Sequence, residues 1–299
     1  MLIFRSFELC DKPFIDFYLK PYQFECSELT FTNMIIWGQG EKIRWAEHDD
    51  VLYVLLQFGG FPAFMFPPIP KNKNSCCYPS AINVAVRYFF ENGIQPRFRS
   101  ISGPFVPLFQ KYCPQFSLVA DRDTYDYVYR TENLIQLSGR KYHAKRNHIH
   151  QFESQYAFAY HPLTPDMTDE CMELYLSWLQ EKDIDEPGIL GEMNAIRFLL
   201  PNMSALGVEG GCVTIGDKVV AFSLGEQINP HSALIHIEKA DASYVGLFAV
   251  INQKFAENTW SHLQYINREE DMGMPGLRKA KLSYRPVKLI EKYVAVLRP

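Results

Sequence analysis

A short apolar run in the second half of the chain ends in side chains that can take or hold protons, His236-Ile237-Glu238-Lys239. Alternation along a strand puts His236 and Glu238 on one face and the residues that follow each of them on the other. If the first face lines a crevice, Glu238 is the best single candidate for a general base, with His236 and Lys239 binding substrate. A buried pair satisfied by hydrogen bonds is an equally good interpretation.

A second charged group follows the apolar segment 265–267 and includes Arg268, Glu269 and Asp271. Ligands bind at the strand ends of open α/β sheets because splayed strands leave a crevice there. Glu269 and Asp271 could polarise an attacking amine or hydroxyl, and Arg268 could hold a carboxylate or phosphate. Because Glu238 and Arg268 both lie at strand ends, we predict that they share one cavity. A salt-bridge network with the basic residues of the next helix is the alternative.

That next helical segment, 277–284, ends in Tyr284. It would bring Tyr284 back across the opening of the sheet, where a leaving oxygen or sulfur needs a proton. A phenol with an ordinary pKa of about 10 is protonated at neutral pH and can donate that proton. Lys281 would steady negative charge and Arg278 would bind substrate. The alternative is a packed tyrosine whose hydroxyl bonds to backbone.

The segment 139–150 is rich in Lys, Arg and His and contains no acid. On a helix, Lys141, Lys145 and His148 would fall on one face and, with Arg146, would present positive charge to the phosphates of a donor. A solvated helix face explains the same pattern equally well. The histidines do not have a familiar zinc spacing, so we predict no metal site here.

Composition places the chain among globular proteins and limits its partners. The 299 residues suffice for two domains, and 47% are hydrophobic against 21% charged. A net charge of −4 argues against binding polyanions through bulk electrostatics, so any contact with nucleic acid must be local. The seven cysteines, an odd count without regular spacing, fit a reducing compartment and predict a cytoplasmic protein.

The segment 51–70 is the one candidate for a membrane span, because it carries no charge over twenty residues. Its glycines and prolines would break a spanning helix, so buried strands explain it better. The first residues lack a long apolar run after a basic stretch, so we predict no secretory signal. We therefore predict a protein without a membrane-spanning segment.

The same order of elements appears twice along the chain: a meander of strands, a helix, a strand, a helix and a final strand. In the first half the main expected elements are strands at 43–47, 51–57, 61–66 and 97–101, helices at 79–91 and 106–112, and short strands at 117–120 and 125–129. In the second half they are helices at 192–203, 244–257 and 277–284, and strands at 211–215, 219–227, 233–238, 262–267 and 289–297. This order predicts an α/β (α+β) fold of two mixed-sheet domains, 1–136 and 137–299, with a boundary as late as residue 165 also possible.

Four segments of the chain, 134–141, 145–148, 267–273 and 276–281, resemble those of a bacterial family of uncharacterised proteins. That family is related to the C-terminal domain of phosphatidylglycerol lysyltransferases. The resemblance implies two tandem GCN5-related N-acetyltransferase (GNAT) folds, shared with Fem-type enzymes that take an aminoacyl group from transfer RNA. It also implies the acid role for Tyr284, since GNAT enzymes commonly carry a tyrosine there after an alanine.

The donor is suggested by the loop 240–244. Coenzyme A-dependent members of the GNAT fold cradle pyrophosphate with a glycine-rich loop at a helix start, where backbone donors and the helix dipole favour anions. Here that place holds Asp241, which would repel pyrophosphate. We therefore expect aminoacyl-tRNA as co-substrate in preference to acyl-CoA, and no further cofactor.

Together these residues predict transfer of an acyl or aminoacyl group to an amine or hydroxyl of a small molecule or peptide. Glu238 or Glu269 would take the proton, Arg268 and Lys281 would steady charge, and Tyr284 would protonate the leaving group. The alternative is a GNAT-like module that binds transfer RNA or a small metabolite without chemistry.

Overall fold

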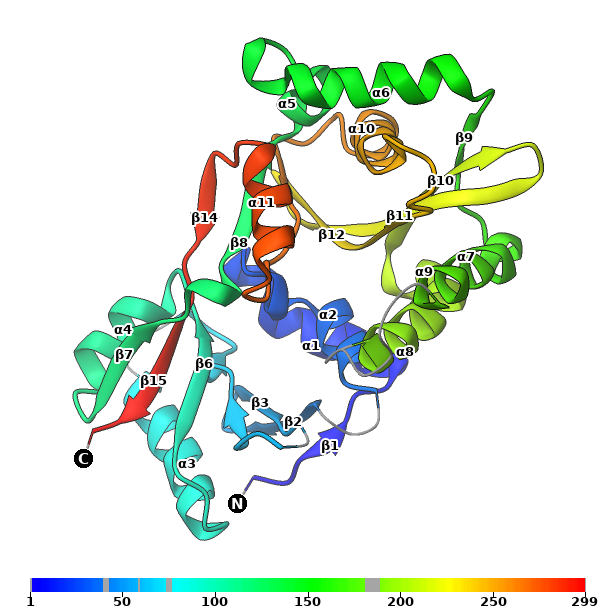
Figure 1. Ribbon diagram of the computed structural model, residues 1–299. Helices are drawn as coiled ribbons and strands as arrows, with labels where there is room; N and C mark the ends of the chain where they lie inside the picture. Colours follow the sequence, from blue (N-terminus) through cyan, green and yellow to red (C-terminus); the bar gives the residue numbers. More distant parts are fainter. Residues whose placement is uncertain (1, 40–42, 59, 74–76, 181–188, 299) are drawn as a thin grey trace. The chain divides into compact units, whose positions relative to one another are not determined.

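The computed structural model describes residues 2–39, 43–58, 60–73, 77–180 and 189–298, which form two compact units (Figure 1). The first unit contains Met1–Asp126, Glu270–Met274 and Leu289–Pro299, and the second contains Tyr127–Glu269 and Pro275–Lys288. Each unit thus takes residues from separate parts of the chain, unlike the two continuous ranges expected from the sequence.

The first sheet has the strand order β1-β2-β3-β4-β6-β15-β7, with β5 paired to β3. Its central strand β3 is buried along its whole length. The strands are β1 (Arg5–Ser6), β2 (Ile43–His48), β3 (Val51–Leu56), β4 (Phe64–Met65), β5 (Ile69–Pro70), β6 (Arg97–Ile101), β7 (Phe116–Ala120) and β15 (Tyr293–Leu297). The helices of this unit are α1 (Lys12–Leu19), α2 (Phe31–Trp37), α3 (Tyr78–Glu91) and α4 (Phe105–Tyr112).

The charge-free segment 51–70 forms β3, β4 and β5, and all three strands are buried. The expectation of buried strands is therefore confirmed for these three strands, whereas the described residues 57–58 and 60–62 lie outside them and Phe61 is 71% exposed. In the part of the chain that the structure describes, no helix is both long enough and apolar enough to cross a bilayer.

The second sheet has the order β14-β8-β13-β12-β11-β10-β9, and β12 runs parallel to β13. Figure 1 shows α5, α6 and α10 along one side of β10 to β12, and α7 and α9 along the other. The strands are β8 (Asp126–Arg130), β9 (Ala159–Pro162), β10 (Val208–Ile215), β11 (Lys218–Asn229), β12 (Ser232–Ala240), β13 (Tyr265–Asn267) and β14 (Lys288–Ile290). The helices are α5 (Thr131–Gln136), α6 (His143–Gln155), α7 (Thr168–Gln180), α8 (Ile189–Leu199), α9 (Met203–Leu206), α10 (Leu247–Thr259) and α11 (Pro275–Ser283).

Two strands pair with the opposite sheet from the one that the sequence pattern suggested. The final strand β15, expected in the second domain, pairs with β6 and β7 of the first sheet. Conversely β8, expected in the first domain, pairs with β13 of the second. The placement of these strands from the sequence was wrong, because alternation identifies a strand but carries no information about its partner.

Helix α10 starts where two backbones come into close contact. Gly246 precedes it with φ of 96°, a conformation that side chains other than glycine rarely adopt. A Cβ added there would collide with the carbonyl oxygen of His148 in α6. A buried stripe of α10 that includes Leu247, Ile251 and Phe255 then packs in the second unit.

Replacing Gly246 with alanine should therefore lower the free energy of unfolding by about 1–3 kcal/mol, from backbone strain together with the clash against α6. Urea unfolding followed by circular dichroism measures this loss. The control is Gly276→Ala in α11, where an added Cβ meets nothing within 4 Å. Equal effects of the two substitutions would contradict the close contact between α6 and α10.

Candidate active site

The parallel pair β12 and β13 brings Glu238 and Arg268 together. The ladder between these strands ends where Leu234 pairs with Asn267, and β12 continues to Ala240. Arg268 follows the end of β13, and its Nη2 donates to Oε1 of Glu238 at 2.7 Å. Each of the two side chains is 13% exposed. The two side chains thus meet in a direct ion pair, and the cavity predicted around them stays a prediction.

The Glu238 carboxylate is engaged on both oxygens. Asn252 of α10 donates from Nδ2 to Oε2 of Glu238 at 3.2 Å. Two polar atoms beside this carboxylate, Nη1 of Arg268 and Oδ1 of Asn252, are buried and have no hydrogen-bond partner among the described residues. Leaving such an atom unsatisfied costs about 1–3 kcal/mol, so this part of the site retains unused capacity to bind a polar group.

Tyr284 lies against two cations of this site. Its ring centroid is 4.0 Å from Nζ of Lys145 and 5.0 Å from Cζ of Arg268, within the range of cation–π contacts. The residue is 6% exposed. Burial raises the pKa of Tyr284 to about 12, although Arg268 opposes the shift. The phenol therefore keeps its proton throughout the neutral pH range.

Lys145 belongs to this cluster and not to an outward ridge. Burial lowers its pKa, the nearby Arg268 lowers it further, and Glu238 opposes both. Lys145 and Arg268 thus place two positive charges around one phenol, with Glu238 as the carboxylate that contacts Arg268. Such a place favours a ligand or intermediate that carries negative charge.

The other predicted phosphate-binding residues have different surroundings from Lys145. Lys141 is exposed in a 3-10 turn before α6, so the single helix expected for it was wrong. Arg146 donates from Nη1 to the carbonyl oxygens of Leu137 and Gly139 and thereby closes the turn after α5. His148 is exposed on α6. Phosphate binding by these residues stays a prediction.

His236 forms a separate cluster with two carboxylates. Its Nε2 lies 3.1 Å from Oε1 of Glu226, and its Nδ1 lies 3.2 Å from Oε1 of Glu269. The register between β11 and β12 shifts around His236, and a β-bulge of this kind interrupts alternation. The interruption removes the basis for the shared face of His236 and Glu238, and the two side chains contact different residues, Glu226 and Glu269 for His236 but Asn252 and Arg268 for Glu238. Burial opposes protonation, but the carboxylates outweigh it and raise the pKa of His236 to about 9.

Lys239 and Lys281, predicted to bind substrate, both make contacts within the fold. Nζ of Lys239 lies 2.8 Å from Oε2 of Glu192 and 3.7 Å from the ring centroid of Trp178. Nζ of Lys281 donates to the carbonyl oxygen of Arg268 and so anchors the backbone of the arginine. Arg278 is half-buried on α11. Substrate binding by these three residues stays a prediction.

Asp271, predicted to be catalytic, lies in the first unit, whereas the other four candidates lie in the second. Its side chain is fully buried, and Oδ2 lies 3.4 Å from Nη1 of Arg122. Oδ1 accepts the backbone N–H of Gly273 at 2.9 Å. These contacts stabilise the turn that Asp271 begins.

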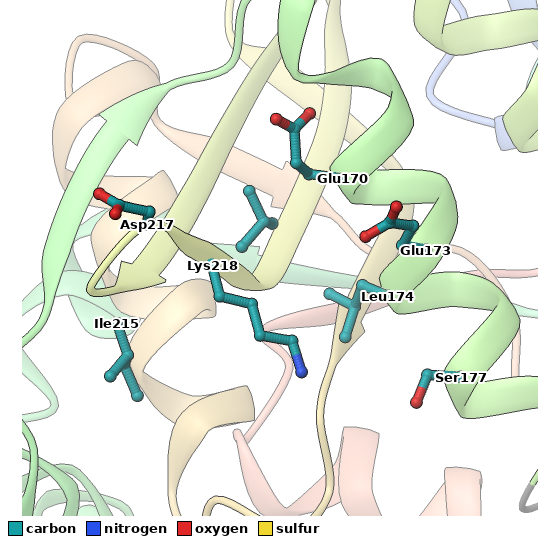
Figure 2. Close-up of a pocket in the computed structure, with 8 residues that line it drawn as sticks. Glu170, Glu173, Leu174, Ser177, Ile215, Asp217 and Lys218 are labelled. Carbon is teal, nitrogen blue, oxygen red and sulfur yellow. The ribbon is translucent and has the colours of Figure 1, made fainter.

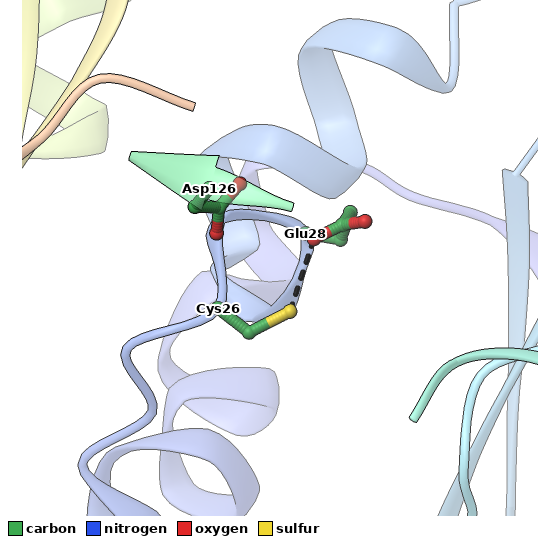
Figure 3. A group of neighbouring side chains, drawn as sticks. All are labelled: Cys26, Glu28 and Asp126. Carbon is green, nitrogen blue, oxygen red and sulfur yellow. Dashed lines mark hydrogen bonds between the residues drawn. The ribbon is translucent and has the colours of Figure 1, made fainter. Parts of the chain in front are cut away.

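A cluster of possible metal ligands in the first unit is formed by Cys26, Glu28 and Asp126 (Figure 3). A cation is already present there, because Nζ of Lys292 lies 2.5 Å from Oε2 of Glu28 and 2.7 Å from Oδ1 of Asp126. Burial raises the pKa of Cys26 well above its ordinary value, so its sulfur remains a thiol. The arrangement is a buried ion cluster, which the sequence reading missed because its members are far apart in the chain.

A pocket of about 570 Å³ lies between α7 and the turn of the β10–β11 hairpin (Figure 2). Glu170 and Glu173 of α7 line it together with Asp217 and Lys218 of the hairpin. None of the site residues predicted from the sequence lines this pocket. The cluster of Arg268, Glu238, Tyr284 and Lys145 is therefore separate from this pocket.

Known proteins similar to this chain include solved structures and one curated relative. A conserved protein of unknown function from Bacteroides thetaiotaomicron is 32% identical, with full coverage of both chains and a TM-score of 0.90. The C-terminal domain of a putative lysylphosphatidylglycerol synthetase from Agrobacterium fabrum is 14% identical, with 97% of this chain and 92% of that chain covered and a TM-score of 0.65. An uncharacterised protein of Mycoplasmoides gallisepticum is 24% identical over 171 residues, and the match covers 56% of this chain and 55% of the relative. The match thus spans about half the length of that curated relative.

The fold extends to more distant proteins. A tandem GNAT protein from the clavulanic acid biosynthesis pathway superposes with a TM-score of 0.54 at 8% identity, covering 100% of this chain and 99% of that one. FemX superposes with a TM-score of 0.59 at 7% identity, covering 99% and 97%. These likenesses confirm the expected tandem GNAT fold. Residues 19–296 match the family described as phosphatidylglycerol lysyltransferase, C-terminal, so the chain belongs to that family.

Proposed function

We propose that this protein transfers an aminoacyl group from aminoacyl-tRNA to an amine or hydroxyl acceptor at the cluster of Arg268, Glu238, Tyr284 and Lys145. The observation that carries the proposal is the meeting of two cations at a buried, protonated phenol. Acyl transfer needs a proton donor for the leaving oxygen and positive charge for the oxyanion that forms during the reaction. Membership of the lysyltransferase family supports the same reaction class.

In the proposed reaction, a neutral amine or a hydroxyl of the acceptor attacks the ester carbonyl carbon of the aminoacyl group. The new bond forms as the carbonyl electron pair moves to oxygen, where Arg268 and Lys145 stabilise the negative charge. The ester bond to the ribose then breaks, and the ribose oxygen takes the proton of Tyr284. Glu238 receives the proton that the acceptor loses, and this proton returns through solvent to the phenolate.

An aminoacyl-tRNA donor is favoured over acyl-CoA by the loop before α10. Oδ1 of Asp241 accepts the backbone N–H of Ser243 at 2.9 Å and its hydroxyl at 2.6 Å. A pyrophosphate at this loop would compete with a carboxylate for the same N–H and would meet its charge. The exposed Lys141 offers positive charge to the backbone of a transfer RNA instead, and the exposed His148 offers a hydrogen-bonding ring.

The decisive experiment supplies the purified protein with transfer RNA charged with radioactive amino acids, and in parallel with labelled acyl-CoA. Acceptors are offered as amino acids, short peptides and vesicles containing phosphatidylglycerol. We expect acceptor-dependent loss of label from the transfer RNA, abolished by Arg268→Ala and retained by Lys20→Ala at the surface of the first unit. Consumption of acyl-CoA without any use of aminoacyl-tRNA would overturn the proposal that aminoacyl-tRNA is the donor. Binding of transfer RNA without turnover would favour the binding module.

Lys141→Glu should weaken binding of transfer RNA and lower the slope of log Kd against log salt by about one unit. The variant loses one phosphate contact, so its binding releases fewer counterions from the nucleic acid. Fluorescence anisotropy over a salt series measures both. Lys20→Glu makes the same charge change at an exposed position of the first unit and should leave the slope unchanged. Parallel salt curves for wild type and Lys141→Glu would remove Lys141 from the binding surface.

A further inference from the structure

We infer that His236 is a positioning residue, which holds Glu269 and thereby fixes the backbone turn from which Arg268 reaches Glu238 and Tyr284. The inference deepens the proposed function and rests on it only where transfer is measured. It reassigns His236 and Glu269, predicted from the sequence to bind substrate and to act in catalysis, to the support of Arg268.

The first step concerns the protons of the imidazole. The His236 side chain is fully buried, and each ring nitrogen lies within hydrogen-bonding distance of a carboxylate oxygen, one from Glu226 and one from Glu269. A carboxylate only accepts hydrogen bonds, so both contacts are made only when both ring nitrogens carry protons. The ring is therefore an imidazolium. Having no lone pair on either nitrogen, it cannot serve as a general base.

The second step concerns the turn after β13. Glu269 has φ of 56°, in the left-handed region that costs a non-glycine residue on the order of 1 kcal/mol or more. A side chain within the turn stabilises it, because the backbone N–H of Glu269 donates to Oδ1 of Asn267 at 2.8 Å. Its carbonyl accepts the N–H of Tyr127 at 3.2 Å. His236 adds a contact to the Glu269 side chain, at 3.2 Å from its Oε1.

The third step joins this turn to the candidate active site. Arg268 and Glu269 are consecutive, so a change in the backbone of one displaces the other. The backbone of Arg268 is also held directly by Lys281, which donates to its carbonyl oxygen. Its own N–H donates to the carbonyl of Tyr127 at 3.0 Å. The guanidinium is thus placed by a backbone that is clamped at Arg268 itself and at Glu269, and the imidazolium of His236 contributes to the clamp at Glu269.

Loss of a proton from His236 should release the clamp. Among the described residues, the charged groups that contact the ring are Glu226 of β11 and Glu269 of the turn. Above its pKa of about 9, the neutral ring can donate to only one of the two carboxylates. One carboxylate then loses its hydrogen bond to the ring, and we expect the turn and the Arg268 side chain to become more mobile.

The test is nuclear magnetic resonance of protein labelled with nitrogen-15 in histidine and arginine. The Arg268 guanidinium signal, assigned by its loss in Arg268→Lys, should change with pH along the same curve as the His236 ring. In His236→Gln that signal should broaden or shift toward the position of a free arginine at every pH. His231→Gln, an exposed histidine at the β11–β12 turn, is the matched control and should leave it unchanged.

Transfer by His236→Gln should fall about 10- to 100-fold in kcat, with the Kd for transfer RNA unchanged. If that variant fails to fold, Glu226→Gln, which keeps the shape of the side chain, takes its place in both measurements. The inference would be overturned if the Arg268 guanidinium signal did not change with pH along the titration curve of His236 and was also unchanged in His236→Gln. A wild-type protein that transfers nothing would overturn the proposed function alone, since the resonance measurement needs no donor.

Discussion

Tyr284→Phe should slow transfer by about two to four powers of ten while leaving donor binding and the fold intact. The substitution removes one oxygen and keeps the ring on which Lys145 and Arg268 pack. Without the hydroxyl, the ribose oxygen must leave as an alkoxide or take a proton from water. Because the pKa of Tyr284 is raised to about 12, the wild-type rate should show no loss from its ionisation up to pH 10. Single-turnover assays with charged transfer RNA measure the rate.

The matched control for this substitution is Tyr78→Phe. Tyr78 is fully buried in the first unit, and its hydroxyl has no hydrogen-bond partner among the described residues. Its removal should leave the rate of transfer unchanged and should not lower the free energy of unfolding, because no hydrogen bond among the described residues is lost with it. If Tyr284→Phe lowers stability by about 1 kcal/mol and leaves turnover intact, the phenol has a packing role and the acid must be sought elsewhere.

Lys292→Met should lower the free energy of unfolding by about 3–5 kcal/mol, the usual cost of removing one partner from a buried ion pair. The side chains of Lys292 and Asp126 are both fully buried, and the ammonium also contacts Glu28 and the hydroxyl of Ser27. Methionine matches the length of lysine but leaves the carboxylates without their cation. Urea unfolding at neutral pH measures the loss, and Lys20→Met at the surface should stay within about 0.5 kcal/mol.

The sign of the pH dependence separates charge from packing in this cluster. Burial already raises the pKa of Asp126, with Lys292 opposing the shift. Loss of the lysine should raise the pKa of Asp126 further. As the pH rises, the Asp126 carboxyl then loses its proton in the unfolded state before it does so in the folded state. The deficit of Lys292→Met should therefore be largest at neutral pH and shrink as the pH falls and the carboxylates protonate. Asp126→Asn added to Lys292→Met should recover part of the stability, and a deficit that is the same at pH 4 and pH 7 would point to packing instead.

Local order was largely readable from the residues themselves. The apolar segment 51–70, broken by glycine and proline, favours buried strands over a membrane-spanning helix. Gly216, with φ of 59°, lies in the turn between the strands expected at 211–215 and 219–227, which pair as β10 and β11. The meeting of Glu238 and Arg268 followed from a general property of open sheets, in which the ends of neighbouring strands share a crevice. The candidate Tyr284 followed from the return of the helix after β13. These features depend on spacings of a few residues and on short connections.

Only the tertiary structure decided which partners these residues have. The bulge at His236 depends on the pairing of β12 with β11 and interrupts an alternation that the sequence presents as regular. In the sequence, Asn252 is one polar residue within the apolar stripe of a helix. Only the packing of α10 shows that its side chain donates to Glu238. Lys292 meets Asp126 across 166 positions of the chain. The spacing of apolar and polar residues determines structure over about ten residues of the chain. Strand pairing, strand register and the partners of ion pairs depend instead on packing between distant segments. The kind of site was therefore readable from the sequence, and the division of its residues between chemistry and support was not.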